Sequence, residues 1–206
     1  MNVLLINGSP HKNGCTNAAL TEMAKVLNEA GIETTIFHIG SAPGGGCVGC
    51  GGCSKAGKCV FGGPVADVLP LVEKADGIVF GAPVHYATAA ASMLGFMHRL
   101  AISGGKYLRH KPAAVGTSAR RAGTTTALEA MEKVPQFFEM PLISSTYWPM
   151  VHGGKAEEVL SDEEGLQIMR NLGRNMAWML RCIEAGKAAG IAAPVAENDK
   201  RTNFIR

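Results

Sequence analysis

The feature that most constrains the fold of this chain is the junction at residues 3–17, VLLINGSPHKNGCTN. Residues 3–6 form an unbroken apolar run, which is expected of a central parallel strand covered on both faces. Turn-forming residues follow, and an amphipathic helix begins near Thr16. A strand that leads through a short polar loop into a helix is typical of an open α/β sheet. The unpaired N–H groups at such a helix start favour an anion.

The polar loop of this junction lacks the glycine pattern of dinucleotide-binding proteins, and it also lacks the lysine pattern of nucleotide-triphosphate P-loops. The hydroxyl and amide groups of Ser9, Asn13, Thr16 and Asn17 suit a terminal monophosphate better than a bridging pyrophosphate. An ordinary strand-to-helix turn is the alternative, since many folds contain one. The junction by itself is consistent with either a phosphate site or a plain turn.

Apolar runs and helical patterns alternate along the rest of the chain. Further strands are expected at residues 32–39, 77–82, 113–117 and 142–146. Helices are expected near residues 65–75, 87–102, 124–134 and 161–186. This alternation predicts a parallel sheet with helices on both faces. We therefore expect one α/β domain at residues 1–187 and an extended C-terminal tail at 188–206. Phe204 and Ile205 of this tail could dock on a partner subunit, and a frayed terminus is the alternative.

The length and charge of the chain argue against several classes of protein. Its 206 residues suffice for a sizeable core, and its formal net charge of +3 is spread along the chain, so neither a nucleic-acid nor a membrane partner is expected. No apolar stretch approaches the roughly 20 residues of a membrane span, and the first residues do not resemble a secretory signal. We expect a cytoplasmic protein in which the six cysteines are thiols or metal ligands rather than disulfides.

Two further loops follow predicted strands, PVHYAT at residues 83–88 and TSARRAGT at residues 117–124. Together with the first junction, they make the chain resemble the flavodoxin-like NAD(P)H-dependent FMN reductases, and it looks closest to the branch that contains the iron–sulfur flavoproteins. The resemblance implies an α/β fold, a flavodoxin-like three-layer sandwich with a five-stranded parallel sheet in the order 2-1-3-4-5. It also implies FMN as the cofactor and NAD(P)H as the co-substrate. We further expect a homo-oligomer, either a dimer or a tetramer.

In the family, the first loop reads G-S-P-R-x-x-G-N-T and holds the FMN phosphate. Here His11 stands where arginine is usual and Cys15 where asparagine is usual. A histidine pairs with phosphate less strongly than a guanidinium does, so a lower phosphate affinity is expected. The resemblance implies the following phosphate-binding residues: Ser9, His11, Asn13, Cys15, Thr16 and Asn17.

The second loop is implied to lie along the isoalloxazine ring through Pro83, Val84, His85 and Tyr86. His85 replaces the usual tyrosine of the family, and Tyr86 can take over its stacking. His85 itself could donate a proton or a hydrogen bond to reduced flavin or substrate. Alternatively, it is a strand-end histidine bonded to the backbone.

The third loop is implied to bind the pyrimidine edge of the flavin through Thr117, Ser118 and the flexible backbone at Gly123. A cation at this edge would stabilise the anionic reduced flavin. Arg120 or Arg121 could supply it, or could bind the phosphates of the pyridine nucleotide. The alternative is a solvated basic loop.

Residues 40–63, a glycine- and cysteine-rich insertion, contain ten glycines and four cysteines spaced C-x2-C-x2-C-x5-C: Cys47, Cys50, Cys53 and Cys59. Four thiolates this close in sequence can converge on one metal centre. The resemblance implies a [4Fe–4S] cluster next to FMN. A zinc site and a metal-free loop are the alternatives.

The remaining cysteines and one aromatic loop lead to separate predictions. Cys182 is expected to be a buried small hydrophobe. Cys15 lies at a predicted helix N-terminus, which lowers a thiol pKa, so it is either a redox-sensitive thiol or a residue that simply lines the phosphate loop through its backbone N–H. The aromatic loop at residues 147–153 could shield the flavin, form a hydrophobic cluster or make a dimer contact.

Together, these observations predict an FMN-dependent oxidoreductase that passes reducing equivalents from NAD(P)H to an acceptor. The acceptor could be a quinone, a free flavin, an azo or nitro compound, or an iron–sulfur centre, so the partner is a small molecule or a redox protein. One alternative is a non-enzymatic electron carrier with FMN and a [4Fe–4S] cluster. Another is a metal or thiol sensor on the flavodoxin fold.

Overall fold

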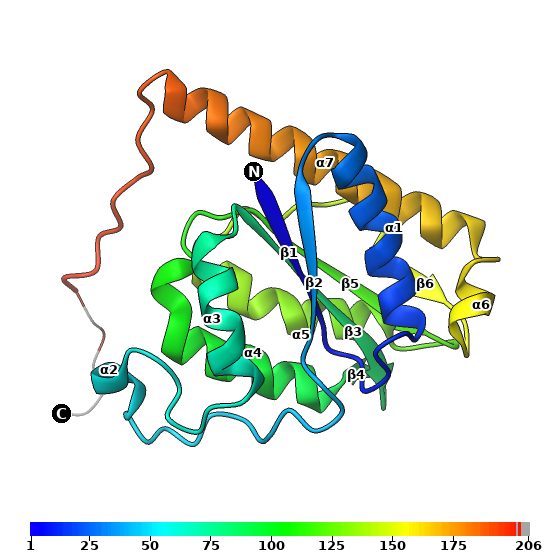
Figure 1. Ribbon diagram of the computed structural model, residues 1–206, viewed down its shortest axis with the longest axis horizontal. Coiled ribbons are helices and arrows are strands. Elements are labelled where there is room, and N and C mark those ends of the chain that lie inside the picture. Colours follow the sequence, from blue (N-terminus) through cyan, green and yellow to red (C-terminus); the bar gives the residue numbers. More distant parts are fainter. Residues whose placement is uncertain (201, 203–206) are drawn as a thin grey trace.

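A computed structural model describes residues 1–200 and 202 of the chain. Its strands are β1 (Asn2–Asn7), β2 (Glu33–His38), β3 (Gly77–His85), β4 (Thr88–Ala89), β5 (Ala113–Ala119) and β6 (Met150–His152). Its helices are α1 (Cys15–Glu29), α2 (Cys53–Ala56), α3 (Pro64–Lys74), α4 (Ala91–Gly104), the 3-10 turn η1 (Gly105–Tyr107), α5 (Thr124–Phe137), α6 (Ala156–Val159) and α7 (Glu163–Ala188). Figure 1 shows how these elements surround a central sheet.

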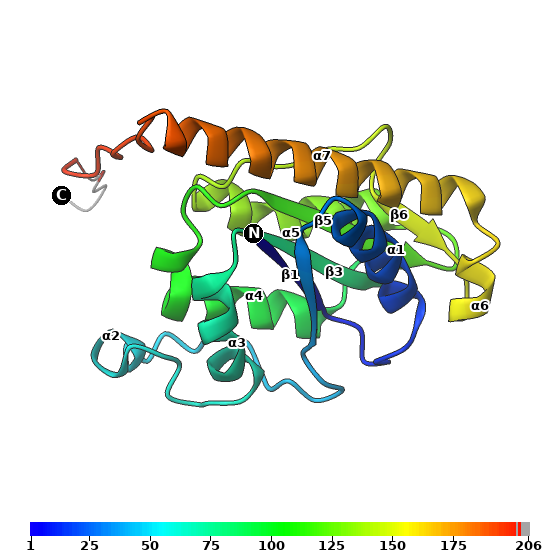
Figure 2. The same cartoon turned by 45° about the horizontal axis from the view of Figure 1, so that its top comes forward.

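The sheet is parallel in the order β2-β1-β3-β5-β6, and the short β4 pairs with β3 in the antiparallel direction. Alternate residues of β1 enter different cores: Leu4 and Ile6 pack with α3, α4 and α5, whereas Val3 and Leu5 pack with α1 and α7. The sheet is therefore covered on both faces (Figure 2), as a flavodoxin-like three-layer fold requires. Without β4, the order of the five parallel strands is the predicted 2-1-3-4-5.

The predicted fifth strand was misplaced. Residues 142–146 form only an isolated bridge between Leu142 and Ala113, and the fifth parallel strand is β6 at residues 150–152. The polar groups of the misplaced segment bond to α7 instead: the Ser145 hydroxyl donates to the Ile168 carbonyl oxygen, and the Asn175 amide donates to the Ser144 carbonyl oxygen. The backbone of Pro141 and Ile143 bonds to Ala113 at the start of β5, but the next polar groups bond to α7, and a local apolar pattern cannot reveal such long-range bonds.

The predicted helix at 87–102 begins four residues later, and β3 continues past the predicted end of its strand. The reason is a tight hairpin between β3 and β4, in which His85 pairs with Thr88 and only Tyr86 and Ala87 form the turn. Such a turn requires positive φ at both central residues, and the φ values are 48° and 61°.

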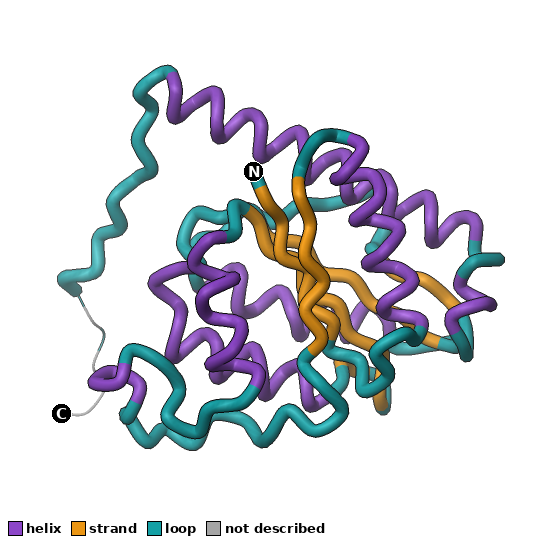
Figure 3. The backbone as a smooth tube through the Cα atoms, in the orientation of Figure 1, coloured by secondary structure: helices purple, strands orange, loops and turns teal. Residues whose placement is uncertain are grey.

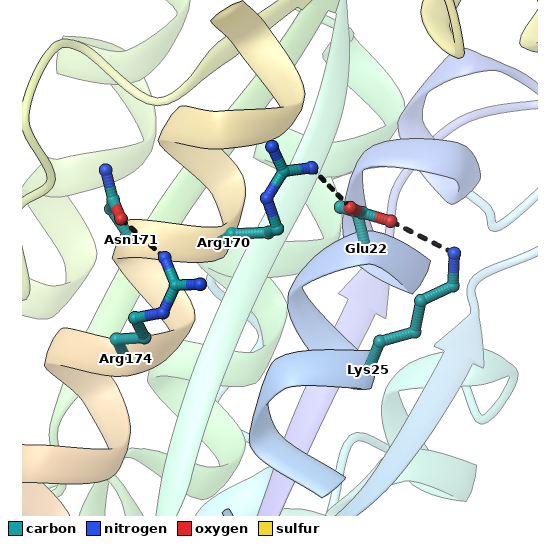
Figure 4. A network of polar contacts seen from close by, with 5 residues as sticks. All are labelled: Glu22, Lys25, Arg170, Asn171 and Arg174. Atoms are coloured by element: carbon teal, nitrogen blue, oxygen red, sulfur yellow. Dashed lines mark hydrogen bonds and ion pairs between the residues drawn. The ribbon is translucent and has the colours of Figure 1, made fainter. Parts of the chain in front are cut away.

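Helix α1 is tied to α7 by a small polar network (Figure 4). The Glu22 carboxylate accepts hydrogen bonds from Arg170 of α7 at 2.6 Å and from Lys25 of α1 at 3.1 Å. Burial alone would raise the pKa of Glu22, but these two cations outweigh it and hold the pKa below its ordinary value. The helix that starts at the first loop is thereby anchored to the long C-terminal helix.

Beyond α7, residues 191–200 form neither helix nor strand and lead away from the end of that helix (Figure 3). Phe204 and Ile205, for which docking on a partner and a frayed terminus were the two alternatives, lie outside the described residues. Within the described part of the chain, no helix is long and apolar enough to span a membrane. The division at residue 187, the cytoplasmic location and the homo-oligomer stay predictions.

Candidate functional site

Three loops meet at the carboxyl ends of β1, β3 and β5, and the first of them, residues 8–14, is held from several sides. Ser9 is buried; its N–H donates to the Asn7 side-chain oxygen at 3.0 Å, and its hydroxyl accepts the N–H of His11 at 3.1 Å. The Nε2 atom of His38, at the end of β2, lies 2.8 Å from the Ser9 carbonyl oxygen. The N–H of Gly8 donates to Gly81 of β3 at 2.7 Å. These hydrogen bonds fix the path of the loop without a ligand.

The start of α1 is left open by this arrangement. Gly14 is the N-cap and has no side chain with which to cap the helix, and the first turn contains no acidic residue. The first N–H groups of a helix have no intrahelical partner, so those of Cys15, Thr16 and Asn17 are available to an anion. His11 and Asn13 are exposed beside them. This donor set fits a phosphate group.

The second loop is the β3–β4 hairpin, and its turn has a strained backbone. Tyr86 and Ala87 occupy the left-handed region, which costs about 1–2 kcal/mol for each non-glycine residue. The Tyr86 side chain is fully exposed, and His85 beside it is exposed too. Among the described residues, the His85 side chain makes no hydrogen bond, so the backbone-bonded alternative has no support. Strain of this kind gathers at functional sites.

The third loop, residues 117–124, joins the other two. The Thr117 hydroxyl donates to the Ala82 carbonyl oxygen at 2.8 Å, and the buried Ser118 and Thr16 hydroxyls lie 2.9 Å apart. Gly123 has φ of 95°, and a Cβ at that position would lie 2.6 Å from the Ala87 Cα. Glycine is thus required both by the conformation and by the close approach of the hairpin.

The remaining predicted residues of the second and third loops differ in exposure. Arg120 and Arg121 both face solvent, while Pro83 and Val84 are half-buried. The structure thus brings the predicted residues of the three loops to one edge of the sheet. The Thr16, Thr117 and Ser118 hydroxyls hold the loops to one another.

Two predictions about single cysteines were wrong. Cys182 lies on the exposed side of α7, whereas a buried position was expected. The pKa of Cys15 is raised, chiefly by burial and further by the carboxylates of Glu158 and Glu157, and the local backbone N–H offsets this only in part. The Cys15 thiol donates to the Gly153 carbonyl oxygen at 3.4 Å.

The cysteine loop, residues 40–63, leaves the end of β2 at the same edge and passes α4 on its way to α3 (Figure 1). All four of its cysteines line one cavity of about 270 Å³, together with Arg99, Ile102 and Ser103 of α4. In the part of the chain that the structure describes, no three histidine, cysteine or acidic side chains stand close enough to hold a single metal ion. The four thiols share one cavity.

Arg99 is the residue of this loop region that sequence analysis missed. It is only 6% exposed, and its guanidinium donates to the Cys59 sulfur at 3.2 Å. Burial alone would raise the pKa of the Cys59 thiol, but the hydrogen bonds from Arg99 and the Phe61 N–H, with the guanidinium charge, hold it below its ordinary value. A charged residue between Phe96 and Leu100 on the apolar face of α4 was the available signal.

The aromatic loop at residues 147–153 lies beside a different cavity. Tyr147 and Trp148 pack edge to face at 4.8 Å, and each remains more than half exposed. They line a cavity of about 450 Å³ with the misplaced segment at residues 142–146, and no residue of the three loops borders it. Shielding of a flavin by this loop stays a prediction.

A flavodoxin-like sheet with three loops gathered at its carboxyl edge, around an open helix start, defines a class of α/β proteins that bind a phosphate-bearing ligand at that edge. Residues 1–155 match the family model of the NADPH-dependent FMN reductases. The chain belongs to this family.

The relatives that this chain matches in sequence include iron–sulfur flavoproteins. An iron–sulfur flavoprotein of Methanocaldococcus jannaschii is 30% identical over 193 residues, which cover 89% of this chain and 100% of that protein. An iron–sulfur flavoprotein of Archaeoglobus fulgidus is 26% identical over 195 residues, covering 87% of this chain and 97% of that protein. Among solved structures, a WrbA-like flavodoxin from Agrobacterium tumefaciens matches with a TM-score of 0.64 at 14% identity, over 88% of this chain and 98% of that one.

Proposed function

We propose that the protein is an FMN-dependent oxidoreductase that passes reducing equivalents from NAD(P)H through FMN to an acceptor. The observation that carries this proposal is the convergence of the three loops around the uncapped start of α1. When bound, FMN supplies the hydride and electron chemistry, and the protein supplies binding, orientation and charge. The family supports both the cofactor and the reductase activity.

The phosphate end is assigned to the first loop. The N–H groups of Cys15, Thr16 and Asn17 donate to the phosphate, and the exposed side chains of His11 and Asn13 close over it. The buried Ser9 orients the loop, because its hydroxyl accepts a hydrogen bond from the His11 N–H. These residues bind through donors that are already oriented before the cofactor arrives.

The ring end is assigned to the second and third loops. Pro83, Val84 and His85 lead to the exposed Tyr86, which is free to stack on the ring or on the nicotinamide. Gly123 allows the third loop to approach the hairpin. The Thr117 and Ser118 hydroxyls bond within the protein, and the Thr117 N–H donates to the Pro149 carbonyl oxygen at 2.9 Å, so these two residues would act at the pyrimidine edge by positioning the turn that follows β5. Arg120 or Arg121 would place a positive charge at that edge.

The cysteine loop is proposed to hold a [4Fe–4S] cluster through Cys47, Cys50, Cys53 and Cys59. Such a cluster transfers single electrons. The shared cavity of the four thiols and the buried cation beside Cys59 support this proposal, as do the iron–sulfur flavoprotein relatives. The acceptor would then be a small molecule or a redox protein.

The first experiment is the visible spectrum of anaerobically purified protein, with flavin identification and analysis of iron, sulfide and zinc. We expect FMN bands and a broad absorbance that dithionite bleaches, with about four irons per chain. Flavin bands without iron would contradict the proposed cluster and would still agree with the proposed reductase. A colourless protein that takes up no added FMN would contradict the whole proposal and favour the sensor.

The second experiment is anaerobic oxidation of NADH and of NADPH with an artificial acceptor. Turnover with either nucleotide supports the reductase, whereas no turnover with both would favour the non-enzymatic carrier. Arg121→Ala separates the roles of this side chain: a higher KM for the nucleotide indicates phosphate binding, and a lower flavin potential indicates charge stabilisation. Arg109→Ala, which removes an exposed arginine paired with Glu139, is the matched control.

A further inference from the structure

Arg99 reaches the cysteine loop at both of its ends. Its guanidinium donates to the Pro43 carbonyl oxygen at 3.3 Å, before the first cysteine, and to the Gly62 carbonyl oxygen at 2.7 Å, after the last. A third bond goes to the Cys59 sulfur at 3.2 Å. The planar fork of one side chain, itself fixed on α4, thus closes the segment that contains all four thiols.

Among the described residues, this guanidinium has no carboxylate as a partner. The buried Nε atom of Arg99 has no hydrogen-bond partner in the described part of the chain either. A buried cation without a counter-charge is costly. The side chain nevertheless lines the 270 Å³ cavity whose wall contains the four cysteines. Four metal-bound thiolates would supply the missing negative charge.

We propose that Arg99 is a positioning residue for the centre held by the cysteine loop: it clamps the two ends of the loop and provides the counter-charge to the thiolates. This inference rests on the proposed cluster, because the counter-charge needs a thiolate-bound centre. The clamp, meaning the bonds from Arg99 to Pro43 and Gly62 at the two ends of the loop, does not need a metal centre. A fixed cation favours the more negative, reduced state of the centre, so its removal lowers the midpoint potential.

The clamp is tested in metal-free protein with FMN bound. Trypsin cuts after lysine, and Lys55 and Lys58 are exposed within the loop. In Arg99→Met, cleavage after these two lysines should become about tenfold faster than in the wild type, because local opening becomes easier. Arg99→Lys keeps one charged donor, so its cleavage rate should lie between those of the wild type and Arg99→Met. Arg109→Met is the matched control and should cleave like the wild type.

The counter-charge is tested after anaerobic reconstitution with iron and sulfide. We expect the midpoint potential of the iron centre to fall in the order wild type, Arg99→Lys, Arg99→Met, with Arg109→Met unchanged. FMN content reports that each variant has folded. If Arg99→Met proves insoluble, Arg99→Lys decides both questions, since it should already show faster cleavage and a lower potential.

The outcomes separate this inference from the proposed function. Unchanged cleavage in a variant that retains FMN would overturn the clamp, and an unchanged potential would overturn the counter-charge. A wild-type protein that takes up no iron would remove the proposed cluster and, with it, the counter-charge. The cleavage rates would still decide the clamp in that case.

Discussion

The first loop and the cysteine loop begin at the same edge of the sheet, but different forces hold them in place. The first loop is bonded to β2 and β3 within a few residues, and the helix that follows it is bonded to β5. The cysteine loop is mostly exposed, seven of its ten glycines have positive φ, and Arg99 joins its ends. The first loop is therefore preorganised for its ligand, whereas the second needs its ligand and one side chain for order.

The sharpest test compares two glycines with positive φ. Gly123→Ala should lower the free energy of unfolding by about 3 kcal/mol, because left-handed strain adds to a collision with Ala87. Gly49→Ala, in open space within the cysteine loop, should cost only the left-handed strain, about 1–2 kcal/mol. Urea unfolding of both variants measures the difference, and FMN titration should show weaker binding for Gly123→Ala alone. Equal losses would mean that the two loops are equally constrained.

A second comparison removes one hydroxyl from each region. Thr16→Val should cost about 2 kcal/mol, because it leaves the buried Ser118 hydroxyl without its partner. Ser54→Ala removes an exposed bond to the Gly51 carbonyl oxygen and should cost less than about 0.5 kcal/mol. Thermal or urea unfolding measures both. In the double variant Thr16→Val/Ser118→Ala, the loss should be smaller than the sum of the single losses.

The anchor of α1 adds a pH-dependent contribution. Glu22→Gln should lower stability by about 1 kcal/mol at pH 7, because the mostly buried carboxylate loses its bonds to Arg170 and Lys25. The pKa of Glu22 lies below 4.5 in the folded protein, so its stabilising effect is present above pH 4.5 and is lost as the pH falls through the folded value.

The measurement is urea unfolding at several pH values for the wild type, Glu22→Gln and Lys25→Gln. The wild type and Glu22→Gln should converge in acid. Lys25→Gln removes the exposed partner and should cost less than about 0.5 kcal/mol at pH 7. A Glu22→Gln deficit that stays constant from pH 7 to pH 3 would contradict the assigned ion pair.

The last comparison concerns thiol reactivity in metal-free protein and leaves stability unchanged. Cys15 should react with iodoacetamide about tenfold more slowly than Cys47 or Cys50, since burial raises its pKa while the other two side chains are exposed. Mass spectrometry of peptides after timed alkylation measures each rate. Faster reaction at Cys15 would show that the helix N-terminus dominates after all.

Much of the fold could be predicted because it is recorded in local patterns. The run at residues 3–6 and the polar loop after it predicted the strand, turn and helix that the structure contains. The misplaced strand at residues 142–146 shows the limit: its apolar residues suit a strand, but Ser145 bonds to a helix about twenty residues further along the chain. The exposure of Cys182 likewise depends on how far the neighbouring elements cover α7.

By itself, the sequence determined the alternation of strands and helices, the three loops and the spacing of the four thiols, because periodicity and turn chemistry act over a few residues. The tertiary structure alone decided which groups meet. Thr16 and Ser118 are 102 residues apart, and Arg99 lies 56 residues from Pro43. Such contacts depend on how the sheet and helices pack, so only the folded chain shows a preorganised first loop and a buried cation beside the cysteines.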